Sequence, residues 1–274
     1  GVRMPPAAQR WALVLSSGSK RGFAHAGALA ALERSGLKPD LVVGSSAGAL
    51  VGAIYASGAS AEEMARTQVG DAFDSVFGVL SGKAGRTARL NAFIQRHLRE
   101  RSLERFPIPF AAVAARLDDG CLAMFNAGDA ARAVYASMSV PGFFTPATIS
   151  GARYGDGGLV SPLPIRVARS LGATLVVAVD VSFHPGWELP DKFIDAMFYG
   201  PLLAVRNLAV LEAEEADLVI RPRLPSVERI EKGEYAAVTA AGDAAMTEAL
   251  PKIRELLRNP PAPRPMVADP RYCA

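Results

Sequence analysis

Two short motifs combine residue types that could carry out acyl transfer. The first, Gly44-Ser45-Ser46-Ala47-Gly48, matches G-x-S-x-G and stands between an apolar run and an alanine-rich stretch. A serine on a tight strand-to-helix turn projects its hydroxyl above the sheet, at a helix N-terminus that favours developing negative charge. Gly44 and Gly48 remove side chains that would clash there. The pattern predicts Ser46 as a nucleophile, with Ser45 as the alternative.

A possible base for this serine lies in a second glycine-rich turn. Residues 148–160 read TISGARYGDGGLV, so Asp156 directly precedes Gly157 and Gly158. An aspartate in a turn often does no more than bind its own backbone. As a base it is weak in water, with a reference pKa of about 3.9, and partial burial would strengthen it. We therefore expect Asp156 to be shielded from water if it acts on Ser46.

A third motif, residues 16–22 (SSGSKRG), joins a predicted strand to a predicted helix. Backbone amides at such a helix start suit an anion or an oxyanion. The alternative is a dinucleotide site, but that site needs an acidic residue after the second strand and a Tyr-x-x-x-Lys pair, and the sequence has neither. We therefore expect an oxyanion hole beside Ser46. Its amides would come from Gly18, Ser19, Lys20, Arg21 and Gly22.

The sequence contains three histidines, and one of them keeps a different mechanism open. Ser46, Asp156 and His184 follow the chain order of an α/β-hydrolase triad. Such enzymes place several strands before the nucleophile, whereas only about two are predicted before Ser46. His25 is expected to be a helix residue satisfied by a hydrogen bond. The triad with His184 remains the alternative to a serine–aspartate pair.

Apolar runs and helical periods predict the elements that position these motifs. Strands are expected at 11–17, 41–43, 110–115, 174–181 and 217–221. Helices are expected at 21–35, closed by Gly36, and at 45–56, 129–138, 164–171, 193–215 and 235–257, with a capping box at Ser60–Glu63. Apolar strands that alternate with helices indicate a parallel sheet covered on both faces.

The domain organisation follows from the same patterns. We expect an arm at 1–10, one catalytic domain at 11–258 and a proline-rich, irregular tail at 259–274. Residues 71–109 are rich in arginine and weakly patterned, so they are the candidate for a lid or a variable insertion.

Composition narrows the class of protein and its surroundings. The chain has 274 residues, is 50% hydrophobic and carries a net charge of +3, which is typical of a globular protein and too weak to indicate a nucleic-acid partner. No apolar run reaches the roughly 18 residues that a membrane span needs. Because the numbering begins at Gly1, a removed leader would leave no trace. A cytoplasmic location or one at a membrane surface is favoured, and a periplasmic or secreted one stays open.

Two cysteines, Cys121 and Cys273, are far apart in the chain. Their spacing predicts no disulfide framework and no metal site. We expect one to be a small buried hydrophobe and the other a free thiol, which fits a reducing compartment.

The three motifs in this order, SGSKRG, GSSAG and DGG, resemble those of the patatin-like phospholipase family. The flanking stretches FAHAGALAALE, ASMSVPGFFTP and SPLPIRVARSLGA resemble bacterial members, and the resemblance extends from Trp11 to Val181 with a weaker match at 216–222. The family's G-x-G-x-x-G hexad differs here, because Ser17 and Ser19 occupy its first and third positions.

The resemblance implies a patatin-type α/β fold, three-layered α/β/α with a mostly parallel sheet. It also implies a Ser46–Asp156 dyad without histidine, an oxyanion hole at Gly18 to Gly22, and hydrolysis of lipid acyl esters with no metal or other cofactor. A lipid or acyl-ester substrate and contact with a membrane surface are the expected partners. The alternative is a non-catalytic relative that binds a lipid or a protein.

Overall fold

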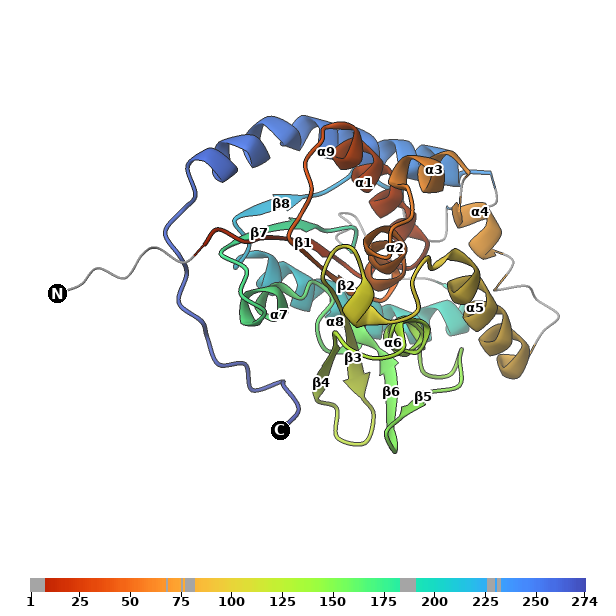
Figure 1. The fold of residues 1–274 in the computed structure, drawn as a ribbon. Helices are drawn as coiled ribbons and strands as arrows, with labels where there is room; N and C mark the ends of the chain where they lie inside the picture. The colour runs from red at the N-terminus through yellow and green to blue at the C-terminus, as the bar shows by residue number, and fades with distance from the viewer. Residues whose placement is uncertain are drawn as a thin grey trace.

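An eight-stranded sheet forms the centre of the described part of the chain (Figure 1). The computed structural model describes residues 8–67, 69–74, 76, 82–182, 191–225, 230 and 233–274. The strand order is β5-β6-β3-β2-β1-β7-β8, and β4 also pairs with β3. The strands that run parallel are β1 (Trp11–Leu15), β2 (Leu41–Ser45), β3 (Phe110–Arg116), β7 (Leu175–Val179) and β8 (Leu218–Ile220). The expected strands and the mostly parallel sheet are confirmed.

Three short strands extend the sheet in the antiparallel direction, and the sequence patterns do not predict them. They are β4 (Leu122–Phe125), β5 (Ala147–Ile149) and β6 (Ala152–Asp156). β4 and β6 both pair with β3, and β5 pairs with β6. Asp156 therefore ends a strand as well as beginning the turn that the sequence indicates.

Helices cover both faces of the sheet, which confirms the three-layer architecture (Figure 1). Alternate residues of each strand point to opposite faces, and both faces are buried, so the strands read as unbroken apolar runs. In β1, Leu13 faces one helical layer and Val14 faces the other. The first layer contains α1 (Ala24–Arg34), α2 (Ala47–Ala56), α3 (Ala61–Arg66), α4 (Val69–Asp74), α5 (Lys83–His97), α6 (Ala130–Met138) and α9 (Tyr235–Arg258). The opposite layer contains α7 (Ile165–Ser170) and α8 (Phe193–Ala213).

The predicted signals at helix ends take the expected geometry. Gly36 follows α1 with φ of 78°, the left-handed conformation that glycine adopts readily. Ser60 precedes α3, and its side chain accepts a hydrogen bond from the Glu63 amide at 3.2 Å. These local contacts fix where the elements start and stop.

Residues 71–109 contain the helix α5, which packs on the core through its apolar face. Leu90, Phe93 and Ile94 of this helix are buried, and Arg86 Nε donates to the Phe143 carbonyl at 3.1 Å. Its role as a lid remains a prediction, since residues 75 and 77–81 lie outside the described part. Within the described residues, no helix combines the length and the apolar character needed to cross a bilayer.

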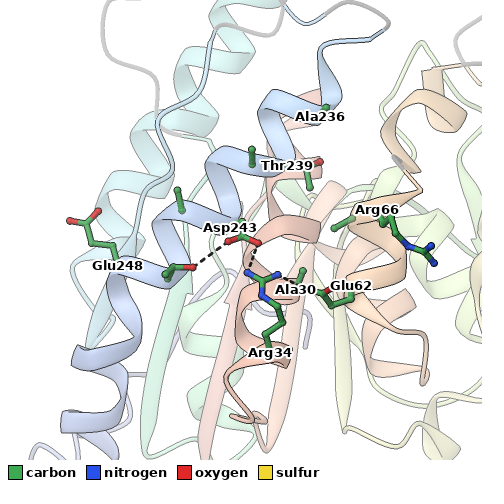
Figure 2. Close-up of a pocket in the computed structure, with 12 residues that line it drawn as sticks. Ala30, Arg34, Glu62, Arg66, Ala236, Thr239, Asp243 and Glu248 are labelled. Carbon is green, nitrogen blue, oxygen red and sulfur yellow. Dashed lines mark hydrogen bonds and ion pairs between the residues drawn. The ribbon is translucent and has the colours of Figure 1, made fainter.

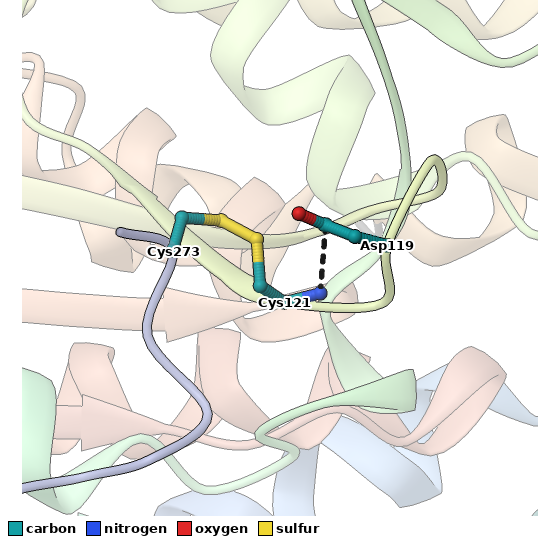
Figure 3. Close-up of side chains that lie close together, drawn as sticks. All are labelled: Asp119, Cys121 and Cys273. Carbon is teal, nitrogen blue, oxygen red and sulfur yellow. Dashed lines mark hydrogen bonds between the residues drawn. A yellow bond between two sulfur atoms is a disulfide. The ribbon is translucent and has the colours of Figure 1, made fainter.

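The expectation of two unpaired cysteines is wrong. Cys121 and Cys273 form a disulfide, with their Cα atoms 5.0 Å apart (Figure 3). Backbone pairing brings them together, because Leu122 N donates to Arg271 O at 2.6 Å and Cys273 N donates to Leu122 O at 3.0 Å. Asp119 lies beside the pair, but the joined sulfur atoms leave no thiolate for a metal. Disulfides are typical of oxidising compartments, so the inference of a reducing compartment loses its support.

Candidate active site

The two side chains predicted to react with each other are in direct contact. Ser46 Oγ donates a hydrogen bond to Asp156 Oδ2 at 2.6 Å, although 110 positions separate them. Ser46 follows β2 and Asp156 ends β6, and only β3 stands between these strands in the sheet. The side chains are nearly closed to solvent, with 9% of Ser46 and 7% of Asp156 exposed. The sheet order therefore brings the hydroxyl and the carboxylate together.

Ser46 occupies a strained turn that only its small neighbours permit. Its φ is 55° and its ψ is −120°, a region that residues with side chains rarely adopt. A Cβ atom on Gly48 would lie 2.1 Å from Leu15 O, so no larger residue fits. Ser45, the alternative nucleophile, is fully buried in β2, and its hydroxyl has no hydrogen-bond partner among the described residues.

The end of helix α6 binds the backbone amides of both Ser46 and Asp156, a feature that the sequence does not predict. Ser137 Oγ accepts a hydrogen bond from the Ser46 amide at 2.8 Å and donates one to the Val113 carbonyl at 2.5 Å. The Asp156 amide donates to Ser139 O at 3.0 Å. Nothing in the stretch ASMSV marks these two serines, because their partners lie on distant segments.

Burial sets the acid–base character of Asp156. Removal from water raises the pKa of its carboxyl to about 6, while hydrogen bonds from Ser46 and from the Gly158 amide oppose the rise. The Gly158 amide donates to Oδ1 at 2.8 Å, and the serine hydroxyl donates to Oδ2. The carboxylate is thus oriented through both oxygens and is more basic than an exposed aspartate.

The glycine-rich loop lies directly against the serine turn. A Cβ atom on Gly22 would approach the Ala47 Cβ to 2.2 Å. The loop turns tightly into a 3-10 helix, η1 (Ser19–Phe23), and Ser19 has φ of 52°. The Arg21 amide is already engaged, since it donates to Gly18 O at 3.0 Å, and the Gly22 amide lies within η1. The amides of Gly18, Ser19 and Lys20 stand at the start of the turn, where helical amides lack partners within the helix.

The cationic side chains of this loop bind the protein itself. Lys20 Nζ lies 3.3 Å from Asp74 Oδ1 and donates to Ile230 O at 3.2 Å. Arg21 is buried, and its Nε donates to Val181 O at 2.8 Å. Both side chains therefore anchor the loop.

Two of the three histidines have structural contacts, as expected for His25. Its ring is buried, and Nε2 lies 2.9 Å from the Ser16 carbonyl. Burial lowers the pKa of His25 to about 4, so the ring is neutral at pH 7. His97 Nδ1 lies 2.8 Å from the Phe93 carbonyl in the preceding turn of α5. His184 lies outside the described residues, so the triad alternative remains untested.

A surface hollow of about 850 Å³ lies away from Ser46 and Asp156, between α1, α3 and α9 (Figure 2). Arg34 reaches into it from α1 and bonds both Glu62 and Asp243, the latter at 2.6 Å. These two carboxylates satisfy the guanidinium, and the lining, which also includes Arg66 and Glu248, contains neither Ser46 nor Asp156. We therefore assign it no part in the chemistry.

Comparison with known proteins agrees with the family resemblance of the motifs and with the fold. The mouse "Patatin-like phospholipase domain-containing protein 6" is 34% identical over 190 residues, 65% of this chain and 14% of that protein. An "Uncharacterized NTE family protein" of Mycobacterium tuberculosis is 31% identical over 182 residues, 63% of this chain and 49% of that protein. The chain thus spans less than half the length of these relatives.

A solved structure and a family model complete the comparison. VipD from Legionella pneumophila superposes with a TM-score of 0.53 over 90% of this chain and 67% of that chain, at 14% identity, and so shares the fold. The model of the family described as "Patatin-like phospholipase" matches residues 13–169, more than half of the sequence. The chain belongs to the patatin-like phospholipase family.

Proposed function

We propose that the chain is a serine hydrolase that cleaves fatty-acyl esters of lipids, with Ser46 as nucleophile and Asp156 as its base. The observation that carries this proposal is the 2.6 Å hydrogen bond from a strained serine to a buried aspartate of raised pKa. The names of its relatives support a lipid ester as the substrate class.

The reaction proceeds through an acyl-enzyme. Asp156 Oδ2 accepts the Ser46 proton while Oγ bonds to the ester carbonyl carbon, which gives a tetrahedral oxyanion. The oxyanion collapses, the bond to the leaving alcohol breaks, and Asp156 returns the proton to that alcohol. Water then attacks the acyl-serine, and Asp156 takes its proton. The acid leaves, and Ser46 regains its hydrogen.

The loop amides stabilise the oxyanion in this proposal. Of the five residues that the sequence indicates, Gly18, Ser19 and Lys20 supply the donors, since the Arg21 amide is bonded to Gly18 O. Loss of one such donor costs roughly 3 kcal/mol of transition-state stabilisation in a serine protease. Gly22 contributes by letting the loop approach Ala47.

A chromogenic acyl-ester assay, followed by a phospholipid in mixed micelles, tests this function. We expect turnover in the wild type, loss in Ser46→Ala and in Asp156→Asn, and near-normal rates in Ser45→Ala and His184→Ala. A large loss in His184→Ala would replace the dyad by the triad. Absence of turnover from the wild type on both substrates would instead favour a binding protein.

A further inference from the structure

A four-residue segment, Val160–Leu163, connects the aspartate turn to the glycine-rich loop; we call it the link. The amides of Val160 and Ser161 donate to Gly157 O at 3.1 and 2.9 Å, directly after Asp156. On its other side, the Ser17 amide donates to Pro162 O at 2.9 Å. A displacement of the link would therefore move the base and the amide loop together.

A buried glutamate of α8 holds the link. Glu212 accepts a hydrogen bond from Ser161 Oγ through Oε2 and one from the Leu163 amide through Oε1 at 3.1 Å. The side chain is 7% exposed, and burial raises the pKa of Glu212 to about 7. A charged carboxylate in such a place is costly unless a cation compensates it.

Arg271 supplies that cation and also binds the link directly. Its Nη1 donates to Val160 O at 2.8 Å and to Glu212 Oε2 at 3.2 Å. Its Nε and Nη2 donate to Asp269 at 3.0 and 2.7 Å, which fixes the guanidinium plane. Arg271 thus joins the link, α8 and its own segment in one network.

Arg271 is held by a short segment, Asp269–Cys273, that we call the strap. The strap comes after α9 in the sequence and lies beside β4, where it makes two backbone hydrogen bonds to Leu122 (Figure 1). The disulfide between Cys121 and Cys273, two residues beyond Arg271, adds a covalent anchor (Figure 3). Both cysteines are partly exposed, so a reductant can reach them.

We propose that Arg271 is a positioning residue for the aspartate turn, and that the Cys121–Cys273 disulfide keeps it in place, so that thiol reduction lowers turnover. The inference rests on the proposed function. Without the disulfide, the strap keeps its two backbone hydrogen bonds to Leu122, the Arg271 network, the ion pair of Asp269 with Arg166 at 3.7 Å and the packing of Tyr272. When the strap leaves, Glu212 loses its cation, and water from a neighbouring hollow of about 190 Å³ reaches the link. The Ser46–Asp156 contact then loosens.

Substitution of Arg271 separates positioning from simple stability. We expect Arg271→Met to lower kcat roughly tenfold with little change in KM, the size of effect expected for loss of a charged hydrogen bond. The acidic limb of its pH–rate profile should move below about pH 6, because water would enter around Asp156. Arg271→Lys should recover part of the rate.

The matched control is Arg264, an arginine of the same tail that contacts other segments. It donates to Glu214 O at 3.1 Å and to Ala216 O at 3.3 Å, and among the described residues it makes no hydrogen bond or ion pair with the link. Arg264→Met should leave kcat and the pH profile unchanged. If Arg271→Met merely lowers the melting temperature and keeps the wild-type kcat and acidic limb, the inference is wrong.

Reduction is tested on the intact chain with tris(2-carboxyethyl)phosphine. The reagent should lower wild-type kcat and speed hydrogen exchange in the peptide that covers residues 156–164. The reagent should not change kcat or hydrogen exchange of the Cys121→Ser/Cys273→Ser double variant, and both should equal those of the reduced wild type. Equal hydrogen exchange and equal kcat of the wild type with and without reductant would contradict the proposed role of the disulfide. If the wild type shows no Ser46-dependent turnover, the proposed function fails. Hydrogen exchange in this peptide still tests the inference, by comparison of the wild type with and without reductant and of Arg271→Met.

Discussion

At the scale of single residues, burial raises the basicity of Asp156, as its proposed role as a base requires. An exposed aspartate binds a proton too weakly to take one from a serine hydroxyl. Here the carboxyl is almost closed to solvent, and its pKa rises to about 6. A base with this pKa is ionised at neutral pH and still has an appreciable proton affinity. The proposed action of Asp156 on Ser46 therefore depends on the exclusion of water from the carboxyl as well as on the two residue types.

The raised pKa predicts the pH dependence of turnover. Asp156 must be ionised to accept the Ser46 proton, so kcat/KM should fall as the pH drops through about 6. The measurement is ester hydrolysis from about pH 4.5 to about pH 9, with circular dichroism at each pH to show that the chain is folded. A rate that stays flat down to about pH 4.5 would mean that Asp156 is not the base.

The same burial predicts that removal of the charge stabilises the fold. The folded pKa of Asp156 lies above its unfolded value of 3.8, so stability is lost as the pH rises from about 4 to about 6. Asp156→Asn should abolish turnover yet increase the free energy of unfolding by about 1–3 kcal/mol above pH 6. Urea unfolding measures this, and Asp129→Asn, at the exposed start of α6, is the control that should change little. A destabilised Asp156→Asn protein would contradict the account.

At the scale of elements, a strand end, a helix start and a helix end form the site together. β2 delivers Ser46 to the start of α2, and β6 delivers Asp156 to its turn. The end of α6 binds the backbone of both through Ser137 and Ser139. The strain at Ser46 persists because these neighbours leave the turn no alternative.

Ser137→Ala tests this role of α6. The change leaves the buried Ser46 amide without a partner, which should cost about 1–3 kcal/mol of stability and lower kcat roughly ten- to hundredfold through misplacement of the nucleophile. Ser57 provides the matched control, because its buried hydroxyl also bridges two backbone groups, Ile54 O and Arg99 N. Ser57→Ala should lose stability but keep kcat. Equal kcat in Ser137→Ala and Ser57→Ala would contradict a role of α6 in positioning Ser46.

How well the sequence predicts an element depends on whether its signal is local. The apolar runs of β1, β2, β3 and β7 and the caps at Ser60 and Gly36 are visible in the sequence, and the structure confirms them. β4, β5 and β6 have three to five residues each and are partly exposed, so their apolar patterns are weak. β6 also joins the sheet through a distant partner, since Asp156 pairs with Ala114 of β3. The contacts of Ser137 escape prediction for the same reason, because they join residues 91 and 24 positions apart.

At the scale of the whole molecule, the sheet order explains how separate motifs meet. β1, β2, β3 and β6 are consecutive in the sheet, so the loop after β1, the serine turn after β2 and the aspartate after β6 lie at neighbouring strand ends. The motifs can be recognised in the sequence, and the sheet brings them to neighbouring strand ends, so the residues of the expected site could be predicted. The disulfide could not be, since 152 positions separate its cysteines and only the folded path of the tail brings them together.

The most direct test of the central claim is covalent labelling with a fluorophosphonate, followed by peptide mapping. This reagent reacts with an activated serine hydroxyl. We expect the label on Ser46 in the wild type, a much slower reaction in Asp156→Asn and none in Ser46→Ala. Label on Ser45, or equal rates with and without the Asp156 carboxylate, would contradict the account.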